Sequence, residues 1–257
     1  MCLIAFAFDP DAENPLIVAA NRDEFHQRPA RPIHWWNEAP DVLAGRDMAA
    51  AGSWMGVTRS GRFAAVTNVR IPDAPPGKRS RGALVADFLK DDRDPEAWCR
   101  KVFGSREDYG PFNLLVGDLQ GLWYAGSHAP PPRALEPGIH CLSNHLLNTP
   151  WPKVERARRA MAGILDVGLT GRALDQGLLQ MLRDDRAAPD DSLPDTGMGL
   201  ERERMLSPVF IVSGEYGTRC STVLALGARV RMTERRFDRD GARSGEVSWE
   251  FKCLQQG

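Results

Sequence analysis

The chain has 257 residues, of which 42% are hydrophobic and 26% are charged, with a formal net charge of -1 and a pI of about 6.5. This composition is typical of a globular protein with a sizeable core. The balanced charge excludes a general nucleic-acid binder, which would carry a strong basic excess. Length alone allows one large domain or two small ones.

Five cysteines are present, an odd number without a Cys-x-x-Cys pair, at Cys2, Cys99, Cys141, Cys220 and Cys253. This spacing argues against a disulfide framework and a structural zinc site, and it fits a reducing cytoplasm. The apolar run at residues 2–8 has no basic residue before it and is too short for a signal peptide. No stretch reaches the length of a membrane span. We therefore expect a cytoplasmic protein without a membrane-spanning segment or a metal site.

Strands in hairpin pairs are expected at the start of the chain. Residues 2–8 and 16–20 are two apolar runs separated by a turn-rich segment, which indicates a hairpin of buried strands. Residues 52–58 and 63–69 form a second pair around a turn at 59–62. Consecutive strands that pair directly favour antiparallel sheets.

Helices and strands then alternate in blocks. Asp94-Pro95-Glu96 is a strong helix start, with an acid at the N-cap and proline at the first helical position. The other helices are expected at residues 82–90, 149–167 and 172–183, a linker at 183–199, and strands at 113–118, 122–127, 138–143, 209–213, 218–226, 230–237 and 247–252. Blocks of strands and helices favour an α+β fold with segregated helix layers over a doubly wound parallel sheet.

Cys2 has an unusual position. Initiator methionine is normally removed before a small second residue, which would leave Cys2 with both a thiol and a free α-amine. An α-amine has a pKa of roughly 7.7–8.0, so it can accept the proton of its own thiol. One residue then supplies both nucleophile and base. The alternative is that Cys2 is a small buried hydrophobe that begins a strand.

A polar tetrapeptide, Asn21-Arg22-Asp23-Glu24, directly follows the second buried strand. If the first turn is centred near residue 12, Phe8 faces Leu16 and Cys2 lies opposite about Arg22. We interpret the tetrapeptide as a polar cluster at the strand's end, within reach of Cys2. Arg22 would lower the thiol pKa or hold an anion, and a carboxylate would orient the amine. The alternative is an exposed loop with a local ion pair.

These features carry a family resemblance. Met1-Cys2-Leu3-Ile4, the tetrapeptide and Gly52-Ser53-Trp54-Met55-Gly56 resemble the NRDE family, which includes the transport-and-Golgi-organisation protein 2 of animals. Further matches in the expected order are residues 63–68, 113–115, 142–144 and 217–222, so the resemblance covers nearly the whole chain. It implies one domain over residues 1–257.

The NRDE family in turn resembles the cysteine branch of N-terminal-nucleophile hydrolases, with penicillin V acylase and bile-salt hydrolase. That likeness implies a four-layer αββα sandwich of two mainly antiparallel sheets. It also implies a catalytic set, which is here Cys2, Arg22, Asp23, Asn68 and Asn144. The two asparagines each end a strand and would donate hydrogen bonds to an oxyanion, although a lone asparagine there is commonly a turn residue. The arginine-to-acid spacing is tighter than in the acylases, so Asp23 or Glu24 can be the acid.

Five further residues are candidates for ligand binding because they lie in or beside these motifs: Asn21, Glu24, His26, Trp54 and Arg219. His26 is within four residues of the tetrapeptide, and a lone histidine is more often a surface residue than a ligand. The five histidines show no paired spacing for a metal. Trp54 could line a pocket, with core packing as its alternative role.

Two functions remain open. The first is a hydrolase that acts on an amide or thioester of a small acyl substrate and requires no cofactor. The second is a non-catalytic carrier that uses the same pocket for haem or an acyl-coenzyme A-like lipid ligand. The Cys-x-x-Cys-His haem attachment pattern is absent, so haem would be held non-covalently.

Overall fold

The N-terminal hairpin lies in the interior of one sheet, with a strand on each side of it. In the computed structural model, which describes residues 2–254, β1 (Cys2–Phe8) pairs antiparallel with β2 (Leu16–Phe25). Phe8 lies opposite Leu16 and Cys2 opposite Arg22, so the predicted register is confirmed. Met1, whose removal the sequence predicts, lies outside the described residues.

The sheet that contains this hairpin has six strands in the order β10-β1-β2-β11-β12-β13. Every neighbouring pair in it is antiparallel. The additional strands are β10 (Gly138–Leu142), β11 (Tyr216–Leu226), β12 (Arg229–Phe237) and β13 (Arg243–Lys252). Strands from both ends of the chain therefore flank β2, which brings distant motifs together.

The second sheet has seven strands in sequence order, also antiparallel. They are β3 (Ala30–Trp36), β4 (Ala39–Asp47), β5 (Met55–Thr58), β6 (Phe63–Asn68), β7 (Phe112–Gly117), β8 (Leu122–Gly126) and β9 (Arg133–Ala134). The predicted pairing of residues 52–58 with 63–69 is confirmed as β5 and β6.

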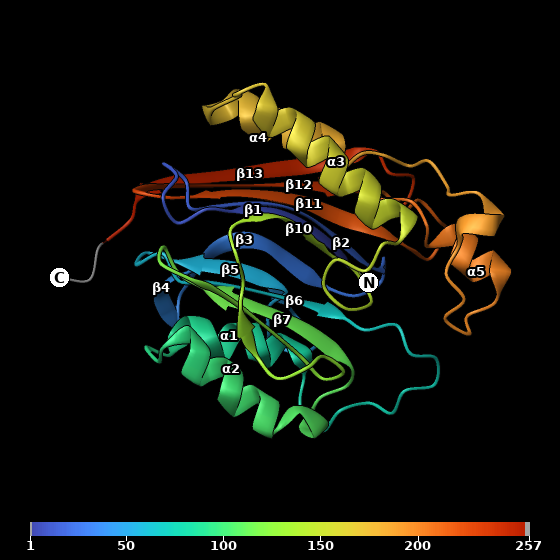
Figure 1. The fold of residues 1–257 in the computed structure, drawn as a ribbon, viewed down its shortest axis with the longest axis horizontal. Helices are drawn as coiled ribbons and strands as arrows, with labels where there is room; N and C mark the ends of the chain where they lie inside the picture. Colours follow the sequence, from blue (N-terminus) through green and yellow to red (C-terminus); the bar gives the residue numbers. More distant parts are fainter. Residues whose placement is uncertain (1, 255–257) are drawn as a thin grey trace.

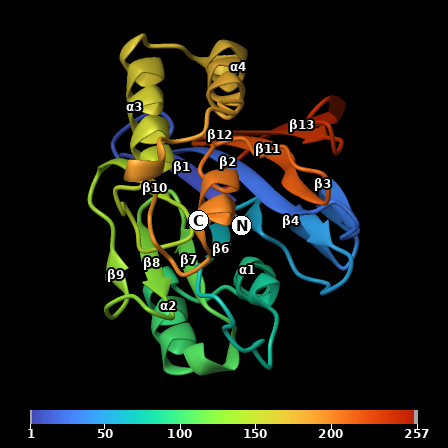
Figure 2. The same ribbon diagram turned by 90° about the vertical axis from the view of Figure 1, so that its right-hand side faces the viewer.

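Helices cover the outer face of each sheet (Figures 1 and 2). The seven-stranded sheet carries α1 (Arg81–Lys90) and α2 (Pro95–Gly104), and the six-stranded sheet carries α3 (Pro152–Asp166) and α4 (Gly171–Met181). As predicted, Asp94 caps α2 by accepting hydrogen bonds from two backbone N–H groups. The four-layer αββα sandwich is therefore confirmed.

The core lies in three layers that follow the two-residue period of the strands. Ile4, Phe6 and Phe8 point between the sheets, while Leu3 and Ala5 point towards α3 and α4. A third cluster fills the space between the seven-stranded sheet and its helices. Because β1 is buried on both faces, it is an almost continuous apolar run in the sequence.

Four parts of the sequence prediction need correction. Residues 209–213 form no strand, because their backbone groups make isolated hydrogen bonds to a loop and to Thr218 instead of a continuous ladder with a neighbouring strand. The N–H of Phe210 donates to the carbonyl of Asp184, and the N–H of Ile211 donates to the Thr218 hydroxyl. β2 continues through the tetrapeptide to Phe25 instead of ending before it. The strands β3 and β4 were not predicted, because prolines interrupt their pattern. A short helix, α5 (Leu200–Met205), follows the linker.

Within residues 2–254, no helix has the length and apolar character needed to cross a bilayer.

Candidate active site

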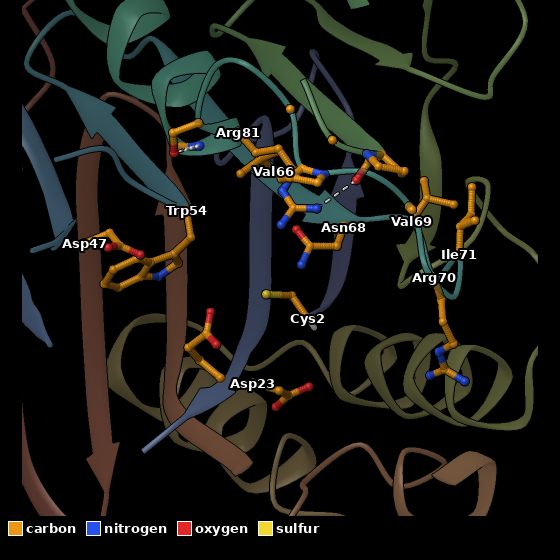
Figure 3. Close-up of a pocket in the computed structure, with 18 of the residues that line it drawn as sticks. Cys2, Asp23, Asp47, Trp54, Val66, Asn68, Val69, Arg70, Ile71 and Arg81 are labelled. Carbon is orange, nitrogen blue, oxygen red and sulfur yellow. Dashed lines mark hydrogen bonds between the residues drawn. The ribbon is translucent and has the colours of Figure 1, made fainter. Parts of the chain in front are cut away.

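A cavity of about 510 Å³ opens at the end of the sandwich where β2, β4 and β6 terminate. Figure 3 looks into it, with Cys2 near its centre. Residues from both sheets, from the segment after β6 and from the turn before α5 line it. They include Cys2, Arg22, Asp23, Asn68, Arg70 and Met198. The cavity therefore gathers residues as far apart in the chain as Cys2 and Met198.

The tetrapeptide occupies two faces of β2. Arg22 shares the inner face with Cys2, and Asn21 and Asp23 face the helix layer. All three are nearly inaccessible to solvent, with exposed fractions of 1% for Asn21, 6% for Arg22 and 1% for Asp23. The alternative of an exposed loop is therefore wrong, because the strand continues through these residues.

Arg22 is held by an aromatic ring and by carboxylates. Its guanidinium carbon lies 4.4 Å from the centre of the Trp54 ring. Its Nη2 lies 3.5 Å from Oδ2 of Asp47 and 4.0 Å from Oε2 of Glu24. Asp47 also accepts a hydrogen bond of 2.7 Å from Nε of Arg28. The charge of Arg22 is thus fixed beside Cys2 by residues of both sheets.

Asp23 is bound from the neighbouring strand. Its Oδ1 accepts a hydrogen bond of 2.7 Å from the Thr218 hydroxyl of β11. Desolvation raises the pKa of Asp23, while the positive charge of Lys153 and the Thr218 hydrogen bond oppose that rise. The ladder between β2 and β11 shifts register between Thr218 and Cys220. This β-bulge places Thr218 opposite Asp23 and Cys220 opposite Arg22.

The two predicted oxyanion donors occupy different positions. Asn68 lines the cavity, and Figure 3 shows its amide directed towards Cys2. Asn144 is fully buried, and its Nδ2 donates a hydrogen bond of 3.0 Å to the backbone carbonyl of Asn68. Asn144 therefore stands behind Asn68 and contacts its backbone.

The Cys2 side chain is partly exposed to this cavity. Desolvation raises the pKa of its thiol, Asp23 adds to the rise, and Arg22 opposes it. All five cysteines are free. Burial raises the pKa of Cys99 and of Cys141 to about 12. Cys2 therefore combines a cavity position with a neighbouring cation, which the buried cysteines Cys99 and Cys141 do not.

The candidate ligand-binding residues divide into two groups. Glu24 and Trp54 line the large cavity. Asn21 instead donates from Nδ2 to the carbonyls of Leu182 and Val209 on the helix side. Like Asn21, His26 and Arg219 do not line the large cavity. The His26 backbone N–H donates to Glu215, and Arg219 donates to the carbonyls of Phe25 and Arg28.

Sequence reasoning missed six charged residues at or behind the cavity: Arg28, Asp47, Arg70, Arg79, Arg81 and Lys153. Asp47 was missed together with the strand that ends at it. Lys153 had a detectable signal, because it falls on the apolar stripe of α3 with Val154, Ala157 and Met161. A lysine in the stripe that faces the sheet indicates a buried charge.

A profile of the Transport and Golgi organisation 2 family matches residues 1–239. Curated relatives with related names cover nearly the same length. The Transport and Golgi organization 2 homolog of Mus musculus is 33% identical over 98% of this chain and 99% of its own length. The Transport and Golgi organization protein 2 homolog of Bos taurus is 36% identical over 91% of this chain and 92% of its own length. The homolog of Homo sapiens is 35% identical over 98% of this chain and 99% of its own length.

Solved structures with a related arrangement share little sequence with this chain. An N-acylethanolamine-hydrolyzing acid amidase ortholog of Caenorhabditis elegans is 11% identical, with a TM-score of 0.48 over 87% of this chain and 92% of that one. The C2A mutant of a conjugated bile acid hydrolase from Clostridium perfringens is 11% identical, with a TM-score of 0.43 over 100% and 98%.

Proposed function

The chain belongs to the Transport and Golgi organisation 2 family, and we propose that it is an N-terminal-nucleophile hydrolase in which Cys2 attacks an amide or thioester of an acyl substrate. One observation carries the proposal. The Cys2 thiol lines a cavity of about 510 Å³, with the Asn68 amide directed towards it and Arg22 directly across the ladder.

The first step uses the two functional groups of Cys2. Once Met1 is removed, the free α-amine takes the thiol proton, and the thiolate attacks the carbonyl carbon of the substrate. The carbonyl electron pair moves onto its oxygen, which the Nδ2 group of Asn68 stabilises by hydrogen bonding. Asp23 balances the charge of the protonated amine, and Arg22 favours the thiolate.

The second half of the reaction returns the enzyme to its starting state. The protonated amine gives its proton to the leaving amine or thiol as the carbon–nitrogen or carbon–sulfur bond breaks, which leaves a thioester on Cys2. Water, deprotonated by the same amine, then attacks this thioester and releases the free acid and the Cys2 thiol. Asn144 acts through its hydrogen bond to Asn68, so we treat it as a positioning residue.

Intact mass and acyl transfer test this proposal. The purified protein should lack Met1, and incubation with a panel of acyl amides and acyl thioesters should give an adduct of one acyl mass. Peptide mapping should place the adduct on Cys2, and Cys2→Ala should abolish it. Retained Met1, or an adduct of equal yield in Cys2→Ala, would overturn the proposal.

Cys253→Ser provides a matched control, because this partly buried cysteine lies near Gly61, outside the residues that line the cavity. The variant should form the adduct at the wild-type rate. We place the activity in the cytoplasm, where five free cysteines remain reduced.

A carrier function is the second candidate, and the arginines of the cavity favour it. Among the described residues, Arg22, Arg28, Arg70, Arg79 and Arg81 line the cavity, against three acidic side chains. Guanidinium groups bind carboxylates and phosphates in a fixed geometry. An acyl-coenzyme A-like ligand or the carboxylates of haem would meet these groups.

The lining side chains also allow a test of fit for haem. Cys2 and Met198 both line the cavity, and sulfur ligands from either residue type can hold haem iron. A titration with haem should saturate near one equivalent, with a shifted absorption band that Cys2→Ala or Met198→Ala alters. No saturable binding of haem or of an acyl-coenzyme A would exclude the carrier function.

A further inference from the structure

A buried lysine lies behind the candidate active site, on the helix side of the six-stranded sheet. Lys153 is the second residue of α3, and its exposed fraction is 3%. Its Nζ donates a hydrogen bond of 2.9 Å to the carbonyl of Leu206. A buried ammonium group is costly unless charges or acceptors compensate it, so the position of Lys153 requires an explanation beyond packing.

The same short segment that binds Lys153 also binds the tetrapeptide. The carbonyl of Val209 accepts from Asn21, and the N–H of Ile211 donates to the Thr218 hydroxyl, which in turn donates to Asp23. Residues 206–211 therefore connect α3 with the helix-facing side chains of β2. Asp23 and Lys153 lie on the same side of the sheet, at its end nearest the cavity.

We infer that Lys153 is a positioning residue of the active site, whose buried ammonium group stabilises the Asp23 carboxylate and the Cys2 thiolate in their charged forms. The inference rests on the proposed nucleophilic role of Cys2. With the Lys153 charge removed, a carboxylate that is 1% exposed would shift towards its protonated form and would balance a protonated α-amine less well.

Electrostatics supports this role. Desolvation lowers the pKa of Lys153 to about 8, and the negative charge of Asp23 is the largest influence that opposes this fall. Desolvation raises the pKa of Asp23, and Lys153 opposes that rise. Other titratable groups also interact electrostatically with Lys153: Cys2 of β1, Cys141 of β10 and Arg70 after β6. Glu203 of α5 lines the same small pocket as Lys153.

Alkylation of Cys2 tests the inference without an acyl substrate. The rate of iodoacetamide labelling at Cys2, followed by peptide mass spectrometry from pH 5 to 10, reports the pKa of its thiol. In Lys153→Met we expect the midpoint to rise by about one pH unit, which slows labelling about tenfold below the midpoint. Lys153→Arg should keep the midpoint close to the wild-type value, because arginine retains the positive charge.

Lys78→Met is the matched control, since Lys78 is 85% exposed near the cavity rim and its charge is screened by water. It should leave the midpoint unchanged. A folded Lys153→Met with the wild-type midpoint would overturn the inference. If Lys153 only held Leu206 in place, Lys153→Met would lower the unfolding free energy and leave the pH dependence of Cys2 labelling unchanged.

A second measurement covers the case in which Lys153→Met does not fold. The pKa of the Lys153 amine, followed by NMR of Nζ in the wild type and in Asp23→Asn, should fall when the carboxylate is neutralised. An unchanged pKa would also overturn the inference. Failure to form an acyl adduct would instead count against the hydrolase proposal, because neither of these measurements requires a substrate.

Discussion

Arg22 stacks on the ring of Trp54, with its guanidinium carbon 4.4 Å from the ring centre, so a cation of one sheet rests on the aromatic residue that immediately precedes β5 of the other. The ring in turn lies over Gly45 of β4. A Cβ at this glycine would meet two carbons of the Trp54 ring at 2.3 Å. The position of the Arg22 charge therefore depends on the absence of a side chain at residue 45.

Gly45→Ala should displace the Trp54 ring and disturb the stack. Overpacking of this kind costs about 1–3 kcal/mol of unfolding free energy. The guanidinium of Arg22 would shift with the ring, so Cys2 labelling by iodoacetamide should also slow. Urea unfolding measures the loss of unfolding free energy, and tryptophan fluorescence reports the displacement of the Trp54 ring.

Gly163→Ala is the control for this substitution. Gly163 lies within α3, and a Cβ there meets no atom within 4 Å. Alanine is favoured over glycine in a helix by about 0.5–1 kcal/mol, so this variant should be as stable as the wild type or slightly more so. Equal destabilisation of the two variants would contradict the steric account of Gly45.

Glu203→Ala should loosen the segment that closes one side of the cavity. Glu203 of α5 pairs with Arg70, and the two side chains are only 4% and 3% exposed. Glu203 also accepts hydrogen bonds from the backbone N–H and the hydroxyl of Thr196. Removal of one partner of a buried ion pair costs about 3–5 kcal/mol. Urea unfolding and limited proteolysis of residues 183–206 measure the loss.

The exposed pair between Arg204 and Asp190 provides the comparison. Its two side chains are 46% and 53% exposed, so water screens the interaction. Arg204→Ala should change the unfolding free energy far less than Glu203→Ala does and leave the proteolysis pattern unchanged. If Glu203→Ala resembled Arg204→Ala in both assays, the buried pair would not be what fastens this segment.

Glu234 should make the folded state less stable as the pH rises. It belongs to β12, is fully buried, and desolvation raises its pKa from 4.5 to about 7, while Cys220, Arg236 and Arg22 oppose the rise. Because the folded-state pKa lies above the unfolded one, the native protein binds the extra proton. The contribution of this proton to the unfolding free energy is on the order of 3 kcal/mol. It is fully present below pH 4.5 and is lost as the pH rises through about 7.

Glu234→Gln isolates this effect, since the amide has nearly the same shape and does not titrate. Unfolding free energies of both proteins should be measured between pH 4.5 and 8. The wild type should lose stability relative to the variant across this range. Parallel curves would show that Glu234 is ionised in the folded protein at the lower pH values.

Much of the architecture is encoded locally and could be predicted. Apolar runs of strand length, turn-forming residues between them and a strong cap at Asp94 specify the hairpins and helices without knowledge of the tertiary fold. The register of Cys2 opposite Arg22 followed from one short turn. The hairpin of β3 and β4 was not predictable in this way, because Pro32 and Pro40 break the strand pattern and packing against the other sheet supplies the order.

The site was only partly predictable, for a physical reason. Cys2, Arg22 and Asn68 lie in conspicuous motifs, but the residues that hold them are contributed by segments far away in the chain. That Asn144 binds the backbone of Asn68 is a fact of tertiary structure. A lysine such as Lys153 has no local signature of its partner, because the carboxylate it faces is 130 residues earlier in the sequence.

The bulge in β11 makes the number of residues between Thr218 and Cys220 a constraint in its own right. In a regular strand these two residues would point to the same face, and only one of them could meet its partner on β2. With Arg219 as the extra residue, Thr218 reaches Asp23 on one face while Cys220 lies inward beside Arg22. Insertions and deletions at this point would therefore be more harmful than substitutions. Adding or removing one residue would move every side chain in the preceding part of β11 to the opposite face of the sheet.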